Sequence, residues 1–290
     1  MQNIVLGVCL AGLVIGTITD LKTREVPDWL SYGLIFSGFG IAFIYAYGLM
    51  DYTILLRSII GFVVMWILAL IMYYTGQWGG GDSKIIMGIG ALIGLNYMYM
   101  DWLTQFPFLL SFIFYSVVFG ALYGMVWSGV LAFRNKKKFK SAFLKINSGK
   151  ITRLIKKLIF AVIVIMIAFS FFFPVNIRIL SLLFAGLLGV TFYLFLFIKA
   201  IESSCMIKKV SPEKLTEGDW IAEDVKHNGK VICGPKDLGV TKKQIAKLIG
   251  LKDEINKVVI KEGVPFVPSF LAAFLLSLFF GIKVFALGFS

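Results

Sequence analysis

Eight long apolar segments, separated by short polar stretches, limit most strongly what this chain of 290 residues can fold into. They lie at residues 2–19, 30–48, 54–74, 85–100, 107–133, 158–174, 177–199 and 266–287. Hydrophobic residues make up 59% of the chain, which exceeds the usual share in soluble domains. Most segments also reach the roughly 17–25 residues that a membrane helix needs. They predict an all-α polytopic membrane protein with about eight transmembrane helices.

The basic residues gather on one side of the predicted helices. With the N-terminus outside, most fall in the cytoplasm: Lys22, Arg24, Lys84 and the basic residues of 134–157 and 199–261. The outer side then receives only Arg57, Arg178 and Lys283. Because loops rich in Lys and Arg stay in the cytoplasm, we expect a multi-pass protein of the plasma membrane with its N-terminus outside. Orientation and contact with anionic membrane lipids explain the net charge of +13, and we expect no nucleic-acid partner.

Two candidate catalytic residues stand out because acidic residues are scarce near the apolar segments. Asp20 closes the first segment, and Asp82 follows three glycines just before the fourth. The predicted topology puts both at the cytoplasmic membrane edge. Charges close to hydrocarbon are costly and are functional candidates, and two carboxylates can carry out acid/base hydrolysis. The plain alternatives are a helix-end charge for Asp20 and an N-cap in a tight turn for Asp82.

Residues near the two aspartates are candidates for binding substrate or shaping the loop. They are Gly79, Gly80, Gly81, Lys84, Glu25 and Asp28. The glycines remove side-chain bulk, so a substrate backbone can approach closely. Lys84 either positions substrate or is only one of the cytoplasmic basic residues that set the orientation of the chain. Glu25 and Asp28 either attract a basic peptide or belong to a solvated loop.

Five regions are expected along the chain. Residues 1–133 hold the candidate catalytic membrane helices, 134–157 a basic cytoplasmic interfacial segment, 158–199 further transmembrane helices, 200–264 a small cytoplasmic α+β module, and 265–290 the final transmembrane helix. The segment 134–157 carries ten basic residues and no acidic one, so it either lies on anionic lipid or docks a partner.

Local patterns predict the elements of the module. Two strands, Asp219–Val225 and Lys230–Cys233, flank the turn Asn228-Gly229. A capping box at Thr241–Gln244 opens a helix that ends at Gly250, and Lys257–Lys261 forms another strand.

The residues around Asp20 and Asp82 resemble those of the archaeal prepilin and preflagellin peptidases, which are membrane aspartyl proteases with a GxGD motif. The first family motif is Asp20 followed by a short basic loop and Val26-Pro27. The second is Gly79-Gly80-Gly81-Asp82 followed closely by Lys84, two apolar segments later. The resemblance implies that Asp20 and Asp82 cleave the short basic leader from pilin-like or archaellin precursors at the cytoplasmic face.

The chain departs from the bacterial relatives in one respect. They carry a cytoplasmic CxxC…CxxC region and an N-methylation activity, whereas Cys9, Cys205 and Cys233 are scattered. We therefore expect peptidase activity without methyltransferase activity, and no metal or cofactor. The oligomeric state stays open.

Two other functions remain possible from the sequence. A presenilin-type intramembrane protease also uses GxGD, but its second aspartate lies within a helix, whereas Asp20 is expected to end one. A transporter coupled to protons or cations also uses paired carboxylates. Under the protease hypothesis the two carboxyl groups share one proton. The helix dipoles then favour Asp82 as the base and Asp20 as the acid.

Overall fold

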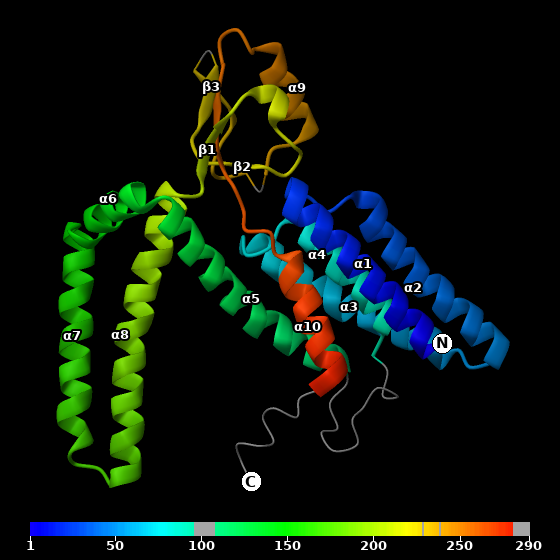
Figure 1. Cartoon of the computed structure of the whole chain (residues 1–290), viewed down its shortest axis with the longest axis horizontal. Coiled ribbons are helices and arrows are strands. Elements are labelled where there is room, and N and C mark those ends of the chain that lie inside the picture. Colours follow the sequence, from blue (N-terminus) through cyan, green and yellow to red (C-terminus); the bar gives the residue numbers. More distant parts are fainter. Residues whose placement is uncertain (96–107, 228, 238, 281–290) are drawn as a thin grey trace.

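The computed structural model describes residues 1–95, 108–227, 229–237 and 239–280. Most of the described chain is helical, and Figure 1 shows two groups of helices below a small sheet module. The first group is a bundle of α1 (Gln2–Thr23), α2 (Asp28–Leu49), α3 (Thr53–Tyr74), α4 (Gly80–Ile93), α5 (Phe108–Arg134) and α10 (Val267–Phe280). The second group contains α6 (Lys136–Asn147), α7 (Lys150–Ser170) and α8 (Val175–Ser204).

Five helices among the described residues are long and apolar enough to cross a membrane: α1, α2, α3, α5 and α8. The polytopic membrane character is therefore supported, while the count of eight spans stays a prediction. The helix α4, with 14 residues, rises only about 21 Å, less than the roughly 30 Å of a bilayer core. The predicted ends of the fourth and eighth segments, 96–100 and 281–287, lie outside the described residues, as does residue 107.

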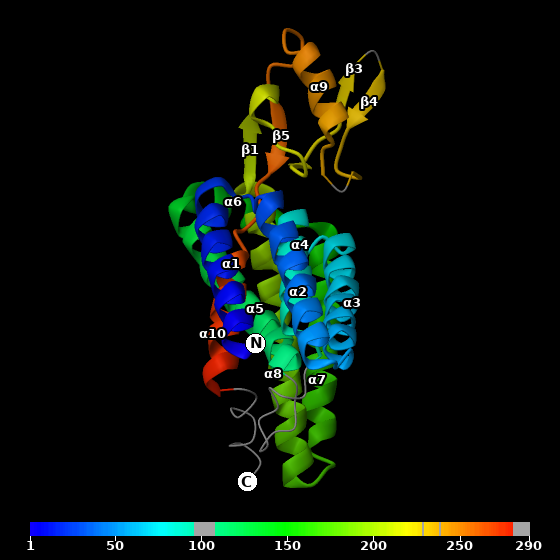
Figure 2. The same cartoon turned by 90° about the vertical axis from the view of Figure 1, so that its right-hand side faces the viewer.

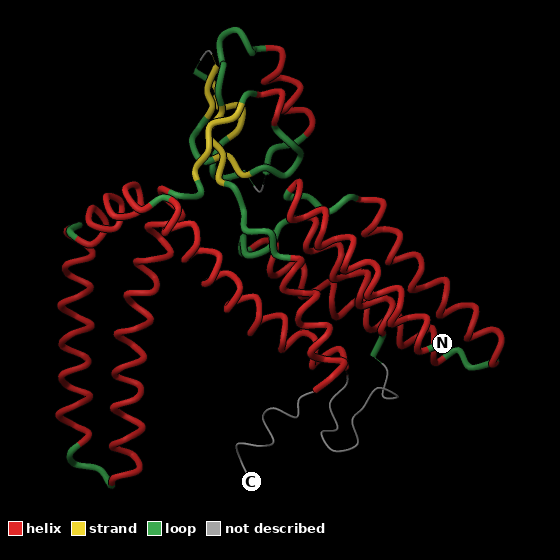
Figure 3. The backbone as a smooth tube through the Cα atoms, in the orientation of Figure 1, coloured by secondary structure: helices red, strands yellow, loops and turns green. Residues whose placement is uncertain are grey.

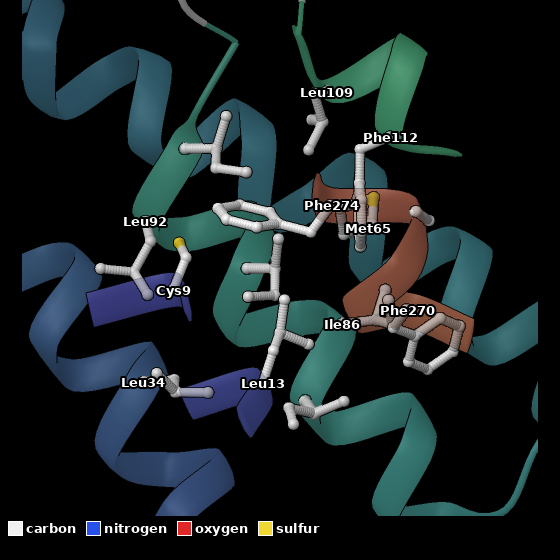
Figure 4. Close-up of a cluster of buried hydrophobic side chains, with 14 of the residues drawn as sticks. Cys9, Leu13, Leu34, Met65, Ile86, Leu92, Leu109, Phe112, Phe270 and Phe274 are labelled. Carbon is white, nitrogen blue, oxygen red and sulfur yellow. The ribbon is translucent and has the colours of Figure 1, made fainter. Parts of the chain in front are cut away.

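Helix α4 lies at the centre of the bundle. Its apolar side chains are buried on several faces, and Ile86 and Leu92 pack with Cys9 and Leu13 of α1 and with Phe274 of α10 (Figure 4). Because no side chain intervenes, the backbones of α3 and α4 approach closely: a Cβ at Gly90 would lie 2.6 Å from the carbonyl oxygen of Gly61. This buried position fixes where the N-terminus of α4, and hence Asp82, is held.

Two helix boundaries near the candidate site differ from the predictions. Helix α1 continues through Thr23, so Asp20 lies in its last turn rather than at its end. Helix α4 begins at Gly80, five residues before the predicted start of the fourth segment, because its first turn is polar and glycine-rich. Its N-cap is Gly79, and Asp82 is the third helical residue instead of the N-cap.

The basic segment 134–157 forms two elements. It contains α6 and the first two turns of α7, which then runs into the apolar segment predicted from residue 158. Figure 3 shows α6 lying across the ends of α7 and α8 that are nearest the sheet module.

The sheet module lies between α8 and α10 and confirms that a small α+β unit precedes the last helix. Strands β1 (Ile207–Val210), β5 (Val258–Lys261) and β2 (Trp220–Ile221) form an antiparallel sheet in the order β1-β5-β2. Strands β3 (Val225–His227) and β4 (Lys230–Cys233) form a separate hairpin with an irregularity at Val225/Lys226. The turn η2 (Pro212–Lys214) and helix α9 (Lys242–Gly250) pack beside them.

Most local predictions for the module are confirmed, with two corrections. The capping box of Thr241 and Gln244 and the last strand occur as predicted. The predicted strand 219–225 is instead divided between β2 and β3, which belong to different sheets. Helix α8 extends through Ser204, so the first residues of the region 200–264 are helical. Asn228 lies outside the described residues.

The module sits over the end of the bundle that carries the loops α1–α2 and α3–α4, as Figures 1 and 2 show. The module and the bundle are in direct contact. Gly76 in the α3–α4 loop has φ +70°, and a Cβ there would lie 2.7 Å from the ring of Trp220. The candidate catalytic residues therefore lie at the membrane-bundle end that the module covers.

Candidate functional site

Asp20 is buried where three helices meet. Its side chain is 5% exposed, and its Oδ2 accepts a hydrogen bond of 3.0 Å from the backbone N–H of Val267, the first residue of α10. One turn earlier, a Cβ at Gly16 would lie 2.7 Å from Ile85 of α4 and 3.2 Å from Val267. A residue without a side chain at position 16 thus allows α1 to approach both α4 and α10 at the level of Asp20.

Asp82 is held at the start of α4 by the loop that precedes it. Its Oδ2 accepts a hydrogen bond of 3.0 Å from the backbone N–H of Gly79 and so completes one half of a capping arrangement. The neighbouring glycine provides room for the first interhelical loop, since a Cβ at Gly81 would lie 3.0 Å from Cβ of Val26. The first turn of α4 therefore packs against the loop that follows α1.

The two carboxyl groups belong to one electrostatic site. Asp20 lies close enough to Asp82 for their negative charges to repel each other. Both are next to apolar side chains, where such repulsion is weakly screened. Two interacting carboxyls in an apolar surrounding favour a state in which one holds a proton, and such a pair can serve as acid and base.

Each carboxylate faces the positive end of a helix. Asp82 lies in the first turn of α4, and Asp20 receives the N–H at the start of α10. The predicted division of roles depended on Asp20 facing only the negative end of α1. Because α10 supplies a positive end to Asp20 as well, helix dipoles no longer distinguish the base from the acid.

Aromatic packing joins the two hydrogen-bond donors. Trp78, which is 5% exposed, precedes Gly79 and lies with its ring 6.0 Å from that of Phe266 and 5.0 Å from that of Phe270. Phe266 in turn precedes Val267. A single aromatic cluster therefore fixes the N–H that contacts Asp82 relative to the N–H that contacts Asp20.

Arg24 closes α1 and connects it to two other parts of the site. It adopts the left-handed conformation with φ 64°. Its guanidinium donates a hydrogen bond of 3.1 Å to the carbonyl of Gly263 and lies 5.1 Å from the ring centre of Trp127 in α5. Arg24 is also near enough to Asp20 for a favourable charge interaction.

Tyr123 of α5 is a residue of this site that the sequence reasoning missed. It interacts electrostatically with both Asp20 and Arg24. Its hydroxyl is buried, and the described part of the chain offers it no hydrogen-bond partner. A tyrosine in an apolar helix carries no local sign of such a position; the spacing of Tyr123 and Trp127, one turn apart, is the only available hint.

Two of the other predicted residues pair with each other. Lys84 Nζ lies 2.6 Å from Oδ1 of Asp28, which ties the start of α4 to the start of α2. Asp28 is thus paired with Lys84. Glu25, by contrast, is exposed in the first loop. Gly80 contacts little, since the nearest atom to a Cβ there is a ring carbon of Tyr73 at 3.9 Å.

Acidic residues of the module approach the same loop. Asp219, next to Trp220 in β2, interacts electrostatically with Glu25 and with Glu262. Partial burial raises the pKa of Asp219 above its ordinary value, against hydrogen bonds from Thr216 that lower it. Within the described ranges no three His, Cys, Asp or Glu side chains gather in a way that could hold a metal ion.

Comparison with known proteins points to one family. Residues 7–125 match the type IV leader peptidase family. The chain is 37% identical over 137 residues to the preflagellin peptidase of Methanocaldococcus jannaschii. This match covers 40% of this chain and 54% of that protein. It is 40% identical over 82 residues to the preflagellin peptidase of Methanococcus maripaludis. That match covers 28% of this chain and 35% of the other protein. It is 32% identical over 113 residues to that of Methanococcus voltae, covering 36% and 48%. The matched region spans between 35% and 54% of these relatives.

Proposed function

We propose that this chain, whose residues 7–125 match the type IV leader peptidase family, is a membrane aspartic endopeptidase that removes the short basic leader from archaellin-like or pilin-like precursors. The observation that carries the proposal is the meeting of Asp20 and Asp82 at one end of the bundle, each held by a backbone N–H. The relatives are named preflagellin peptidases, which favours an archaellin-like substrate.

The proposed chemistry needs only the two carboxyl groups and water. The ionised carboxylate takes a proton from water while the water oxygen attacks the scissile carbonyl carbon. The protonated carboxyl donates a hydrogen bond to the carbonyl oxygen. When the tetrahedral intermediate collapses, the C–N bond breaks and the leaving amine takes a proton from the site. The Tyr123 hydroxyl, which has no other partner among the described residues, is available to stabilise the charge that develops on the carbonyl oxygen.

The orientation of the chain follows from the distribution of charge. We propose that the end carrying the dyad, α6 and the sheet module faces the cytoplasm, since these parts hold most of the basic residues. A substrate anchored in the same membrane by its own helix would then present its leader at this end. Exposed Glu25 supports attraction of a basic leader more than Asp28 does, because Asp28 is paired with Lys84.

A presenilin-type protease is the second candidate. The sequence spoke against it because Asp20 was expected to end a helix, but one structural observation now favours it. Helix α1 continues through Thr23, so Asp20 lies inside a helix. The two candidates differ in where the substrate is cut: before its hydrophobic helix for a leader peptidase, and within that helix for an intramembrane protease.

The proposal is tested by incubating the detergent-solubilised full chain with a synthetic precursor that has a basic leader followed by a hydrophobic helix. The product masses identify the cut. A single cut just before the hydrophobic helix is expected, without a mass increase from N-methylation when a methyl donor is added. A cut within the helix would favour the presenilin-type activity. Recovery of intact precursor alone, from protein that still unfolds cooperatively, would refute both.

A further inference from the structure

A large basic cavity lies away from the aspartates, among the helices of the second group, α6, α7 and α8. It has a volume of about 1130 Å³, is open to the surface, and is lined by α6, the start of α7 and the last turns of α8. Five lysines from these three helices line it: Lys137, Lys138, Lys145, Lys150 and Lys199. The hydroxyl groups of Ser141 and Thr152 add hydrogen-bond donors, whereas the Ser203 hydroxyl already donates to the carbonyl oxygen of Ala200.

The positive charge of this cavity is not balanced by the described chain. No acidic side chain is among the residues that line it, and none of the five lysines forms an ion pair within the described ranges. Glu202 belongs to the same end of α8, but its carboxylate lies 2.9 Å from Lys261 of the sheet module. Five cations around one space repel each other, so a bound anion would relieve the repulsion.

One wall of the cavity is apolar. Ile155 of α7 and Phe192, Phe195 and Leu196 of α8 contribute to it. Below this level both helices present exposed apolar side chains, such as Leu158 at 58% and Phe184 at 54% exposed. The site therefore offers charge at one end and an apolar surface that continues along the helices, which matches an amphipathic anion.

We propose that this cavity binds the phosphate-bearing headgroup of an anionic phospholipid, with the acyl chains lying along α7 and α8. Figure 3 shows α6 crossing the ends of these helices, where the headgroup layer of a membrane would lie. An ammonium group is a strong partner for phosphate, and basic pockets of this kind at the cytoplasmic side suit lipid headgroups. Free phosphate shares the headgroup chemistry but would leave the apolar wall without a partner.

Two pairs of substitutions separate this site from general attraction to anionic lipid. K145Q/K199Q removes two cavity cations, one from α6 and one from α8. K140Q/K157Q removes the same charge from the same cytoplasmic region, at exposed lysines that do not line the cavity. Cooperative thermal unfolding in detergent checks that both variants are folded.

Binding is measured by native mass spectrometry of the detergent-solubilised full chain titrated with phosphatidylglycerol, phosphatidylcholine or inorganic phosphate. We expect one tightly bound phosphatidylglycerol, at least tenfold weaker binding of phosphatidylcholine, and no displacement by millimolar phosphate. K145Q/K199Q should weaken phosphatidylglycerol binding at least tenfold, while K140Q/K157Q leaves it within about twofold. Equal weakening by both pairs, or displacement by inorganic phosphate, would overturn the proposal.

Discussion

Val267 donates its backbone N–H to Oδ2 of Asp20 across 3.0 Å, although the two residues are 247 positions apart in the chain. The last helix of the described chain thus completes the surroundings of a carboxylate from the first. Trp78 packs on Phe266 and Phe270, one residue before and three residues after Val267, and precedes the Gly79 N–H that contacts Asp82. The hydrogen-bond donors of both aspartates consequently depend on the placement of α10.

Removing the Val267 donor should impair the site without unfolding it. Val267→Pro deletes the N–H at the first position of α10, where proline fits a helix. A hydrogen bond to a charged group is worth about 1.5–3 kcal/mol, so kcat should fall about 10- to 100-fold with little change in KM. Val267→Ala keeps the N–H and serves as the control, with most of the activity retained. Equal losses in both variants would show that side-chain packing, not the hydrogen bond, matters.

The Tyr123 hydroxyl should contribute to cleavage rather than to stability. Tyr123→Phe removes a buried oxygen that has no partner among the described residues, so the melting temperature should stay the same or rise slightly. If the hydroxyl supports the carbonyl oxygen during reaction, kcat falls about tenfold or more.

Tyr115 provides a matched control on the same helix. Its hydroxyl is also buried without a described partner, but no interaction with Asp20 accompanies it. Tyr115→Phe should leave kcat and KM unchanged in the same cleavage assay. Wild-type kinetics for Tyr123→Phe would show that the Tyr123 hydroxyl has no role in cleavage.

Gly80 and Gly81, the first two residues of α4, should differ sharply in their tolerance of a methyl group. Gly81→Ala places a Cβ 3.0 Å from Val26 and 3.3 Å from its backbone nitrogen, so the loop after Asp20 must move. Overpacking of this kind costs about 1–3 kcal/mol, and we expect a lower melting temperature and about tenfold lower activity. Gly80→Ala meets nothing closer than 3.9 Å and should behave as wild type. Equal effects at the two positions would contradict the described packing.

The stability of the sheet module should depend on pH through Asp219. Because burial raises its pKa in the folded state, the folded state keeps this proton to a higher pH than the unfolded state does. Its contribution to stability is therefore most favourable below about pH 4, the ordinary value for Asp, and declines as the pH rises through the raised pKa. Asp219→Asn keeps an acceptor for the Thr216 N–H and should flatten this part of the profile. Thermal unfolding followed through tryptophan fluorescence between pH 4 and 8 measures it, and an unchanged profile would contradict the assignment.

Local signals in the sequence were sufficient for several elements. The capping box of Thr241 and Gln244 and the strand β4 depend on neighbouring residues, and both predictions match the structure. The two aspartate motifs were also found from short stretches. By contrast, Ile207–Val210 gave no strand signal because its partner, β5, lies about 50 residues away in the chain.

The surroundings of the aspartates could not be predicted because they come from distant segments. The Val267 N–H, the Tyr123 hydroxyl and the Trp78 ring meet only when α5 and α10 pack on α1 and α4. Backbone groups have no sequence signature, and an aromatic residue in an apolar helix looks the same whether it faces lipid or a buried site. The end of α1 was predicted too early because the polar residues after Thr19 suggested a loop, whereas the helix continues through Thr23.

Under the proposed function, Asp20 and Asp82 together perform the cleavage. Asp20→Asn and Asp82→Asn preserve side-chain size and keep an oxygen acceptor for Val267 and Gly79. With the purified full chain and a synthetic precursor, measured by mass spectrometry, each variant should cleave at least about 100-fold more slowly than wild type while its unfolding transition is retained. Substantial cleavage by either folded variant would contradict the account.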